Sequence, residues 1–213
     1  MKKIFVFAFA ASMMLLSISA NAQIHIDAGY ARTHEVTTSS NTSKTAHYNG
    51  AYAGFGYTLK LGEYFAVDPT VRYTYSKCNE KQWEVADSIY GTYTGTEQRV
   101  EGLLDFQVRL DFSKNLTAFV YAGPRYTYAI SSKGQMVYTA AMVKITKDID
   151  KFDENSTSSH SNVLIGGGIG VDIMQRFRIK AGYDLGLLNQ YTGSASNYSV
   201  KQNMINAGVA VLF

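Results

Sequence analysis

An all-β fold, an eight-stranded antiparallel up-and-down barrel that spans a membrane, is what this sequence predicts. Three observations carry the prediction: an apolar leader at the N-terminus, eight runs that alternate apolar and polar residues, and connections that are alternately short and long. Alternation with a period of two is typical of strands with one apolar face. Short turns at one rim and long loops at the other are typical of up-and-down barrels in membranes.

The first 22 residues predict a secretory signal peptide. They begin with the basic Met1-Lys2-Lys3, continue with the apolar run 4–16, and end with the small residues of Ala20-Asn21-Ala22 that a signal peptidase recognises. We expect cleavage after Ala22, which leaves 23–213 as one barrel domain. A transmembrane helix is the alternative, but serines interrupt this run, and it is shorter than the roughly 20 apolar residues that a span needs.

The first four alternating segments follow the leader. In each, apolar residues share one face, while glycine, threonine and charged residues share the other. These segments are 23–30, 50–61, 65–75 and 100–111, and their apolar faces begin at Ile24, Ala51, Phe65 and Val100. Each is long enough to form a strand with one apolar side.

Four more segments complete the barrel. They are 116–130, 163–173, 177–187 and 205–213, and their apolar faces begin at Leu116, Val163, Phe177 and Ile205. The tight turns are 61–64, 113–115 and 175–176, whereas the long polar connections are 35–46, 77–96, 131–161 and 190–201. The strands therefore run up and down between a rim of turns and a rim of loops.

The charges of the polar face decide between a membrane barrel and a soluble antiparallel sandwich, which also alternates. Six positive and seven negative residues lie on this face: Asp27, Lys60, Asp68, Arg72, Glu101, Asp105, Arg109, Asp111, Arg125, Asp172, Arg178, Lys180 and Asp184. A solvated surface needs no such balance, but charges inside a narrow barrel must be paired. We therefore expect a charge network in the interior, and aromatic girdles at the lipid boundary from residues such as Tyr73 and Tyr126.

Composition excludes several classes of protein. Only 17% of the residues are charged, there are 16 Tyr and 2 Pro, and 17 acidic residues stand against 20 basic ones, two of them in the leader. Such a chain is neither disordered nor suited to binding nucleic acid. The single Cys78 cannot form an intramolecular disulfide. The acidic stretch 148–154 departs from the calcium-loop pattern at Phe152 and Asp153, so we expect neither a metal nor a cofactor.

Two tyrosine- and glycine-rich stretches resemble a known family. Gly50–Tyr57 and Val120–Tyr126 look like strands of the porin-family, OmpA/OmpX-type outer-membrane barrel domains of Gram-negative bacteria. The resemblance implies localisation in the outer membrane, with outer-membrane lipids as partners. It also implies that the terminal aromatic residue, Phe213, is an assembly signal for the barrel-assembly machinery.

Three functions follow for such a barrel. The leading hypothesis is a non-enzymatic structural or surface-interaction protein, because the apolar segment 135–147 predicts a protruding hairpin that an extracellular protein or other surface ligand can contact. A small diffusion channel is the second hypothesis, since glycines such as Gly54 and Gly168 face inward. A lipid-modifying enzyme is the third, but His160 is followed directly by Ser161, whereas the deacylases of this shape place the serine two residues later.

Overall fold

The structure is a computed structural model that describes residues 22–39, 42–86, 89–140, 143–153, 157–194 and 197–213. The predicted signal peptide lies outside these residues, except for Ala22, which begins the first strand. In the described part of the chain, no helix is long and apolar enough to cross a membrane.

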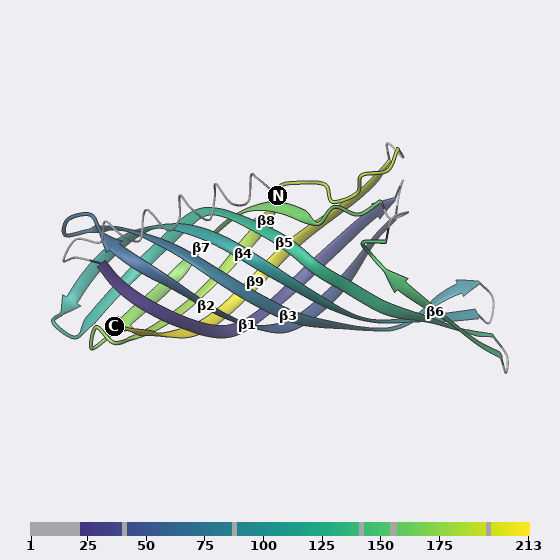
Figure 1. The fold of residues 1–213 in the computed structure, drawn as a ribbon, viewed down its shortest axis with the longest axis horizontal. Helices are drawn as coiled ribbons and strands as arrows, with labels where there is room; N and C mark the ends of the chain where they lie inside the picture. Colours follow the sequence, from purple (N-terminus) through teal and green to yellow (C-terminus); the bar gives the residue numbers. More distant parts are fainter. Residues whose placement is uncertain (1–21, 40–41, 87–88, 141–142, 154–156, 195–196) are drawn as a thin grey trace.

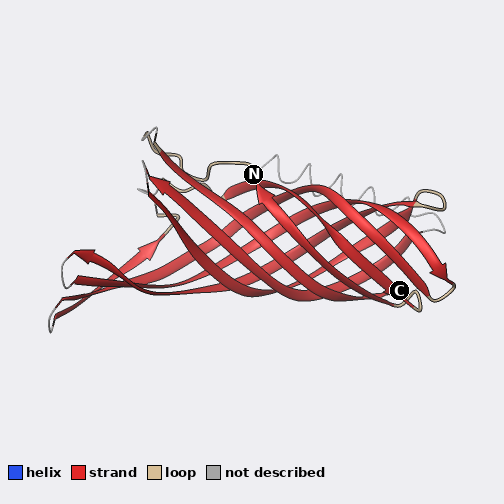
Figure 2. Ribbon diagram, turned by 180° about the vertical axis from the view of Figure 1, so that it is seen from behind, coloured by secondary structure: helices blue, strands red, loops and turns tan. Residues whose placement is uncertain are grey.

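Nine strands make up the described fold. They are β1 (Ala22–Ser39), β2 (Thr42–Lys60), β3 (Phe65–Ala86), β4 (Ile89–Ser113), β5 (Leu116–Ala140), β6 (Val143–Asp150), β7 (Ser161–Ile173), β8 (Phe177–Gly186) and β9 (Tyr198–Leu212). All pair antiparallel, in the order β4-β3-β2-β1-β9-β8-β7-β5, and β4 pairs with β5 to close the ring. The predicted eight-stranded barrel is thus confirmed (Figures 1 and 2).

The ninth strand, β6, lies outside the ring. It pairs with the end of β5, from Lys133 opposite Asp150 to Ala140 opposite Val143. In Figure 1 this hairpin and the adjoining ends of β3 and β4 extend beyond the rest of the barrel at the right of the view, away from the C-terminus. The hairpin predicted for 135–147 is therefore present, and it protrudes from the rim that carries the long connections.

The longest strands continue far beyond what a bilayer requires. β4 and β5 have 25 residues each, which corresponds to about 80 Å, whereas roughly 9–11 residues cross a membrane. The prediction of long polar loops at 35–46 and 77–96 was therefore wrong: β1 and β2 still pair at Ser39 and Thr42, and β3 and β4 at Ala86 and Ile89. Above the membrane no strand face has to meet lipid, so the strict alternation disappears while the backbone ladder continues.

The outer surface of the ring carries an apolar band between two aromatic girdles. Towards the loop rim, Tyr30, Tyr73 and Tyr126 are exposed on the outside, and their hydroxyl groups hydrogen-bond to Asn49, Gln98 and Ser161, at 2.6, 2.9 and 2.9 Å. Towards the turn rim lie Tyr64, Phe65, Phe112, Phe177 and Phe213. Aromatic rings with a polar end favour the boundary between lipid and water, so these girdles mark the limits of the membrane.

Candidate functional site

The inner wall near the turn rim is organised around one carboxylate, that of Asp68 in β3. This side chain is fully buried. Its donors come from several strands and lie 2.6–3.0 Å from its oxygens: His25 Nε2, Thr58 Oγ1, Thr70 Oγ1, Gln107 Nε2 and Arg178 Nη1. A buried carboxylate is stable only when its oxygens are matched by donors in this way.

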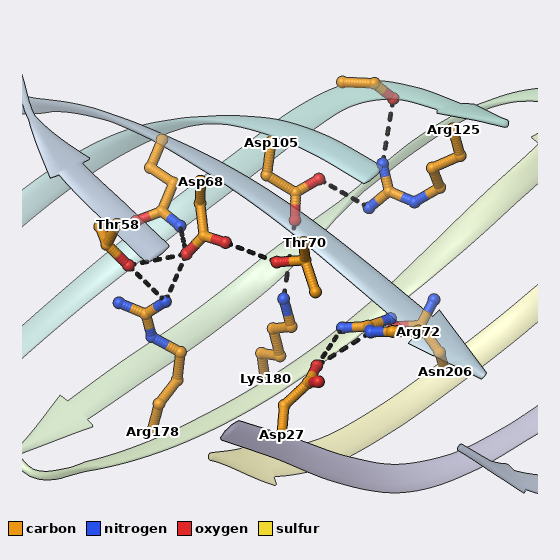
Figure 3. A network of polar contacts seen from close by, with 12 residues as sticks. Asp27, Thr58, Asp68, Thr70, Arg72, Asp105, Arg125, Arg178, Lys180 and Asn206 are labelled. Atoms are coloured by element: carbon orange, nitrogen blue, oxygen red, sulfur yellow. Dashed lines mark hydrogen bonds and ion pairs between the residues drawn. The ribbon is translucent and has the colours of Figure 1, made fainter. Parts of the chain in front are cut away.

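Arg178 links this cluster to the opposite wall of the barrel. Its guanidinium lies 2.6 Å from Asp68 and 2.7 Å from Asp172, and Asp172 also accepts from Arg109 at 2.5 Å. β3 and β8 are four positions apart in a ring of eight, so the Asp68–Arg178 pair joins opposite walls (Figure 3). Side chains therefore fill the lumen at this level, as an eight-stranded barrel of this width allows.

A second group of ion pairs occupies the middle of the barrel. Asp27 in β1 accepts from Arg72 in β3, at 2.9 Å from Nε and 2.8 Å from Nη2. Arg125 lies 2.9 Å from Asp105 and 2.7 Å from Asp184. Figure 3 shows Asp27 with Arg72, Arg125 with Asp105, and the Lys180 amine below Asp105, from which it lies 3.7 Å. The buried charges at this level lie next to charges of opposite sign.

Eleven of the thirteen charged residues expected inside are buried, and two are not. Lys60 is exposed because it is the last residue of β2, so its side chain reaches past the rim. Asp111 is also exposed at the turn rim, where its carboxylate accepts a hydrogen bond from Thr117. In the sequence both residues alternate with the outward-facing apolar residues, but they lie at the rim, where the barrel wall ends.

Three inward-facing rings fill the space that inward-facing glycines leave. Tyr52, Phe119 and Tyr121 are at most 4% exposed. A Cβ at Gly29 would lie 2.6 Å from the Tyr52 ring, and one at Gly168 would lie 2.6 Å from the Tyr121 hydroxyl. The guanidinium groups of the network lie over these rings, with Arg72 4.3 Å from the centre of Tyr52 and Arg178 4.9 Å from Phe119. The inward glycines thus make room for rings.

The loop rim holds charged residues that sequence reasoning missed. Arg99 is buried and lies 3.3 Å from Glu97 and 3.1 Å from Glu101. Above them, the Lys151 amine donates to both carboxylate oxygens of Glu35 at 2.7 Å, and Glu35 also accepts from Gln202 at 2.9 Å. Glu97 and Arg99 share the phase of Glu101, so a longer reading of that strand could have found them. The Glu35–Lys151 pair joins residues 116 apart in sequence and has no sequence signal.

The Glu35–Lys151 ion pair lies above the apolar band. The shifted pKa values of its two groups indicate that both stay charged over a wide pH range. Burial alone would raise the pKa of Glu35, but the adjacent Lys151 ammonium outweighs it, and the pKa is lowered from its ordinary value of 4.5. Burial would likewise lower the pKa of Lys151, but Glu35 raises it above 10.5. The ion pair therefore stabilises the mouth between these values.

We expect protection of the Lys151 backbone amide against hydrogen exchange to stay constant from about pH 5 to about pH 10. This amide donates to Ser132 O at 2.9 Å. Because the pKa of Glu35 is lowered on folding, its contribution is complete above 4.5 and is lost as pH falls through the lowered value. Glu35→Gln is expected to reduce the protection factor at pH 7 about tenfold. An unchanged factor in this variant would contradict the role of the ion pair.

A protruding sheet stands above the loop rim. It consists of residues 79–86 of β3, 89–98 of β4, 131–140 of β5 and the whole of β6. A bulge opposite Gln98 and Arg99 inserts one residue into β5, which shifts the phase of β5 beyond it. One face of the sheet is rich in apolar side chains: Tyr93, Met136, Tyr138, Ile145 and Ile149. The other is mainly polar: Thr94, Thr96, Lys133, Gln135, Thr146 and Asp148.

The residues weighed for catalysis lie in separate environments. The His160 ring stacks on Phe152 and Tyr128, with centroids 3.9 and 5.4 Å apart, and its Nδ1 lies 2.8 Å from Ala129 O. Ser161 Oγ instead lies 2.9 Å from the hydroxyl of the outward-facing Tyr126. Among the described residues, no group of three or more His, Cys, Asp or Glu side chains has the arrangement of a metal site.

A closed ring of tilted strands with an apolar outer band, aromatic girdles and a charged interior defines an integral outer-membrane β-barrel. The comparison with family models agrees. The chain belongs to the family described as "Outer membrane protein beta-barrel domain", whose model matches residues 11–191. No curated protein sequence matches the chain significantly.

The chain is similar to several solved bacterial surface and outer-membrane proteins at low sequence identity. Ail, the attachment invasion locus protein of Yersinia pestis, is 11% identical over 91% of this chain and 99% of its own, with a TM-score of 0.40. Neisserial surface protein A is 14% identical over 91% and 98%, with a TM-score of 0.39. A major outer membrane protein from Thermus thermophilus is 11% identical over 90% and 99%, with a TM-score of 0.44.

Proposed function

We propose that this outer-membrane barrel is a non-enzymatic surface-interaction protein whose protruding sheet binds an extended segment of an extracellular protein by strand addition. The observation that carries the proposal is the edge of β6. In the described part of the chain this strand pairs with β5 alone, so the backbone groups along its other side face away from the sheet. An added strand would satisfy these groups.

The position of this edge favours recognition of another molecule. Long extensions of outer-membrane barrels face the extracellular side, and the β5–β6 hairpin extends, with the ends of β3 and β4, beyond the rest of the barrel (Figure 1). The apolar face, with Ile145 61% exposed, offers an added strand a surface on which to bury alternate side chains. Exposed Lys144, Lys147 and Asp148 along β6 disfavour indiscriminate pairing, because a partner strand must match their charges.

The interior and the mouth support this proposal over the two alternatives. The Asp68–Arg178 pair spans the lumen at 2.6 Å, which leaves little room for a diffusion path at that level. His160 is engaged by two aromatic rings and a backbone carbonyl, whereas the Ser161 hydroxyl contacts the hydroxyl of Tyr126. Both arrangements suit a supporting role better than transport or nucleophilic catalysis.

Thr146→Pro is expected to abolish binding while leaving the barrel folded. The register pairs Ala140 with Val143 across a two-residue connection, so the alternation of an antiparallel ladder directs the amide of Thr146 away from β5. Proline removes this amide, whereas Thr146→Val keeps it and serves as the matched control. Each form would be displayed on a non-adherent bacterial strain, and attachment to epithelial cells and to surfaces coated with fibronectin, laminin or collagen would be counted.

The expected result is attachment at least tenfold above the vector control for the wild type and Thr146→Val, and at vector level for Thr146→Pro. Equal attachment of the two variants would contradict strand addition at β6. Absence of attachment by the correctly inserted wild type would contradict the surface-interaction function itself. Heat-dependent gel mobility of each variant reports that the barrel is folded.

A further inference from the structure

The mouth of the barrel contains a cavity of about 340 Å³. Its walls come from the upper parts of β1, β4, β5 and β9 and from the segments on either side of β7 and β8 that return across the rim. This volume lies within the range of small-molecule sites and at its lower end. The cavity is separate from the outer edge of β6 and plays no part in strand addition.

The segments that close the cavity are held by backbone hydrogen bonds. Ser159 N donates to Gln190 O and Thr192 N donates to Thr157 O, both at 2.8 Å, and Ser158 forms a bridge with Tyr191. From the other side, Lys151 reaches Glu35 at 2.7 Å. These contacts fix the walls in place without a ligand, so the cavity is preorganised.

The charged side chains that line the cavity are paired with one another. Lys151 neutralises Glu35, and the Arg99 guanidinium lies between Glu97 and Glu101, at 3.3 and 3.1 Å. An ionic ligand would have to break one of these pairs and leave its partner buried, which is costly. The electrostatics of the lining therefore favour a neutral ligand.

The remaining lining combines hydroxyl and amide groups with aromatic rings. Hydroxyl and amide side chains include Thr37, Thr127, Thr157 and Gln190. Such groups both donate and accept hydrogen bonds, as sugar hydroxyls do. The rings form two pairs: Tyr191 and Tyr198 meet edge to face at 4.5 Å, and Phe152 stacks on His160 at 3.9 Å. Ring faces of this kind cover the apolar C–H faces of a pyranose while the polar groups hold its rim.

A buried amide lies directly beside the cavity. Asn162 in β7 is 1% exposed and is the register partner of Thr127, which lines the cavity. Neither its amide oxygen nor its amide nitrogen has a hydrogen-bond partner among the described residues. A buried amide in this condition requires polar atoms from within the barrel.

We propose that this cavity binds a neutral saccharide of one or two rings. The paired charges disfavour ions, the aromatic pairs hold the sugar faces, and the hydroxyl and amide groups hold its edge. The ligand class follows from the lining alone, so the inference is independent of the partner that β6 binds.

The test is saturation-transfer difference NMR and calorimetry on the refolded mature protein. Micelles of lauryldimethylamine oxide are used, because a detergent with a sugar headgroup would compete. The neutral probes are the methyl glycosides of glucose, galactose, mannose and N-acetylglucosamine, with maltose and lactose; the charged probes are glucuronate and glucosamine. We expect saturable binding of at least one neutral probe, and binding at least tenfold weaker for the charged probes.

Two variants link binding to the cavity. Ala129→Phe fills it from β5 without removing the backbone atoms that bond His160, and Ile130→Phe places the same ring on the outer face as a control. Filling is expected to abolish binding, and the control is expected to leave it unchanged. Thr127→Val, nearly isosteric, tests the site without filling it and is expected to weaken binding about fivefold. No binding of a neutral probe, stronger binding of a charged one, or wild-type affinity in both cavity variants would overturn the proposal.

Discussion

Replacing Asp68 by alanine is expected to lower the free energy of unfolding of the barrel by about 3–5 kcal/mol. The carboxylate is fully buried and is contacted by five side chains, so its removal takes one of two carboxylates away from Arg178 and leaves the other donors unmatched inside the wall. Urea unfolding of the refolded protein in lipid vesicles, followed by intrinsic fluorescence, measures the loss.

Asp111 offers a matched control for this experiment. It is also an aspartate at the turn rim, but it is exposed, and its carboxylate accepts a hydrogen bond from Thr117 on the neighbouring strand. Asp111→Ala is expected to change the free energy of unfolding by less than about 0.5 kcal/mol. Similar losses for the two variants would mean that the buried cluster contributes no more than an exposed aspartate, and would contradict the central role of Asp68 in the inner wall.

The second large expected effect is the absence of ion conduction by the wild-type protein. The refolded wild-type protein is expected to insert into a planar lipid bilayer without discrete ion-conducting openings, because ion pairs and rings occupy the lumen. The Asp68–Arg178 pair at 2.6 Å closes the path near the turn rim, and the rings of Tyr52 and Tyr121 lie within the barrel above it.

A variant without the inward-facing aromatic rings provides the comparison for the conductance of the wild type. The triple variant Tyr52→Ala, Phe119→Ala and Tyr121→Ala takes away the three large side chains that cover the inward glycines but leaves the Asp68–Arg178 pair in place. We therefore expect discrete openings only when Asp68→Ala and Arg178→Ala are added to it. Insertion is checked in both cases by co-reconstituted marker lipid and by heat-dependent gel mobility. Steady openings of the wild type would replace the surface-interaction function by a channel.

The alternation of apolar and polar residues predicted most of the fold but only part of the barrel interior. The period of two located all eight ring strands, since one face of each must meet lipid and the other must not. It failed above the membrane, where neither face has to meet lipid, so it did not predict the extent of β3 and β4 or the inward position of Glu97. The alternation also assigned Lys60 to the interior, but this residue is the last of β2 and its side chain is exposed beyond the rim.

The pairing of the charges could not be read from the sequence at all. His25 has its nearest partner far along the chain: its ring lies 3.0 Å from Asp68, 43 residues away, because both strands turn these residues inward at one level. The mouth depends on still more distant contacts, such as Lys151 with Glu35. The roles of Phe213 as an assembly signal and of Ala22 as the cleavage site stay predictions.

The ion pairs that cross the lumen have a consequence for how the barrel closes. The inner charges of β1 to β4 are mainly acidic, with five carboxylates and three guanidinium groups: Asp27, Asp68, Glu97, Glu101, Asp105, Arg72, Arg99 and Arg109. Those of β5 to β9 are mainly basic: Arg125, Arg178, Lys180, Asp172 and Asp184. An open sheet therefore keeps two oppositely charged, hydrated surfaces that attract each other as the ring forms. Water leaves both surfaces together when Asp68 meets Arg178, so we expect closure of the ring and pairing of its interior to occur as a single cooperative event.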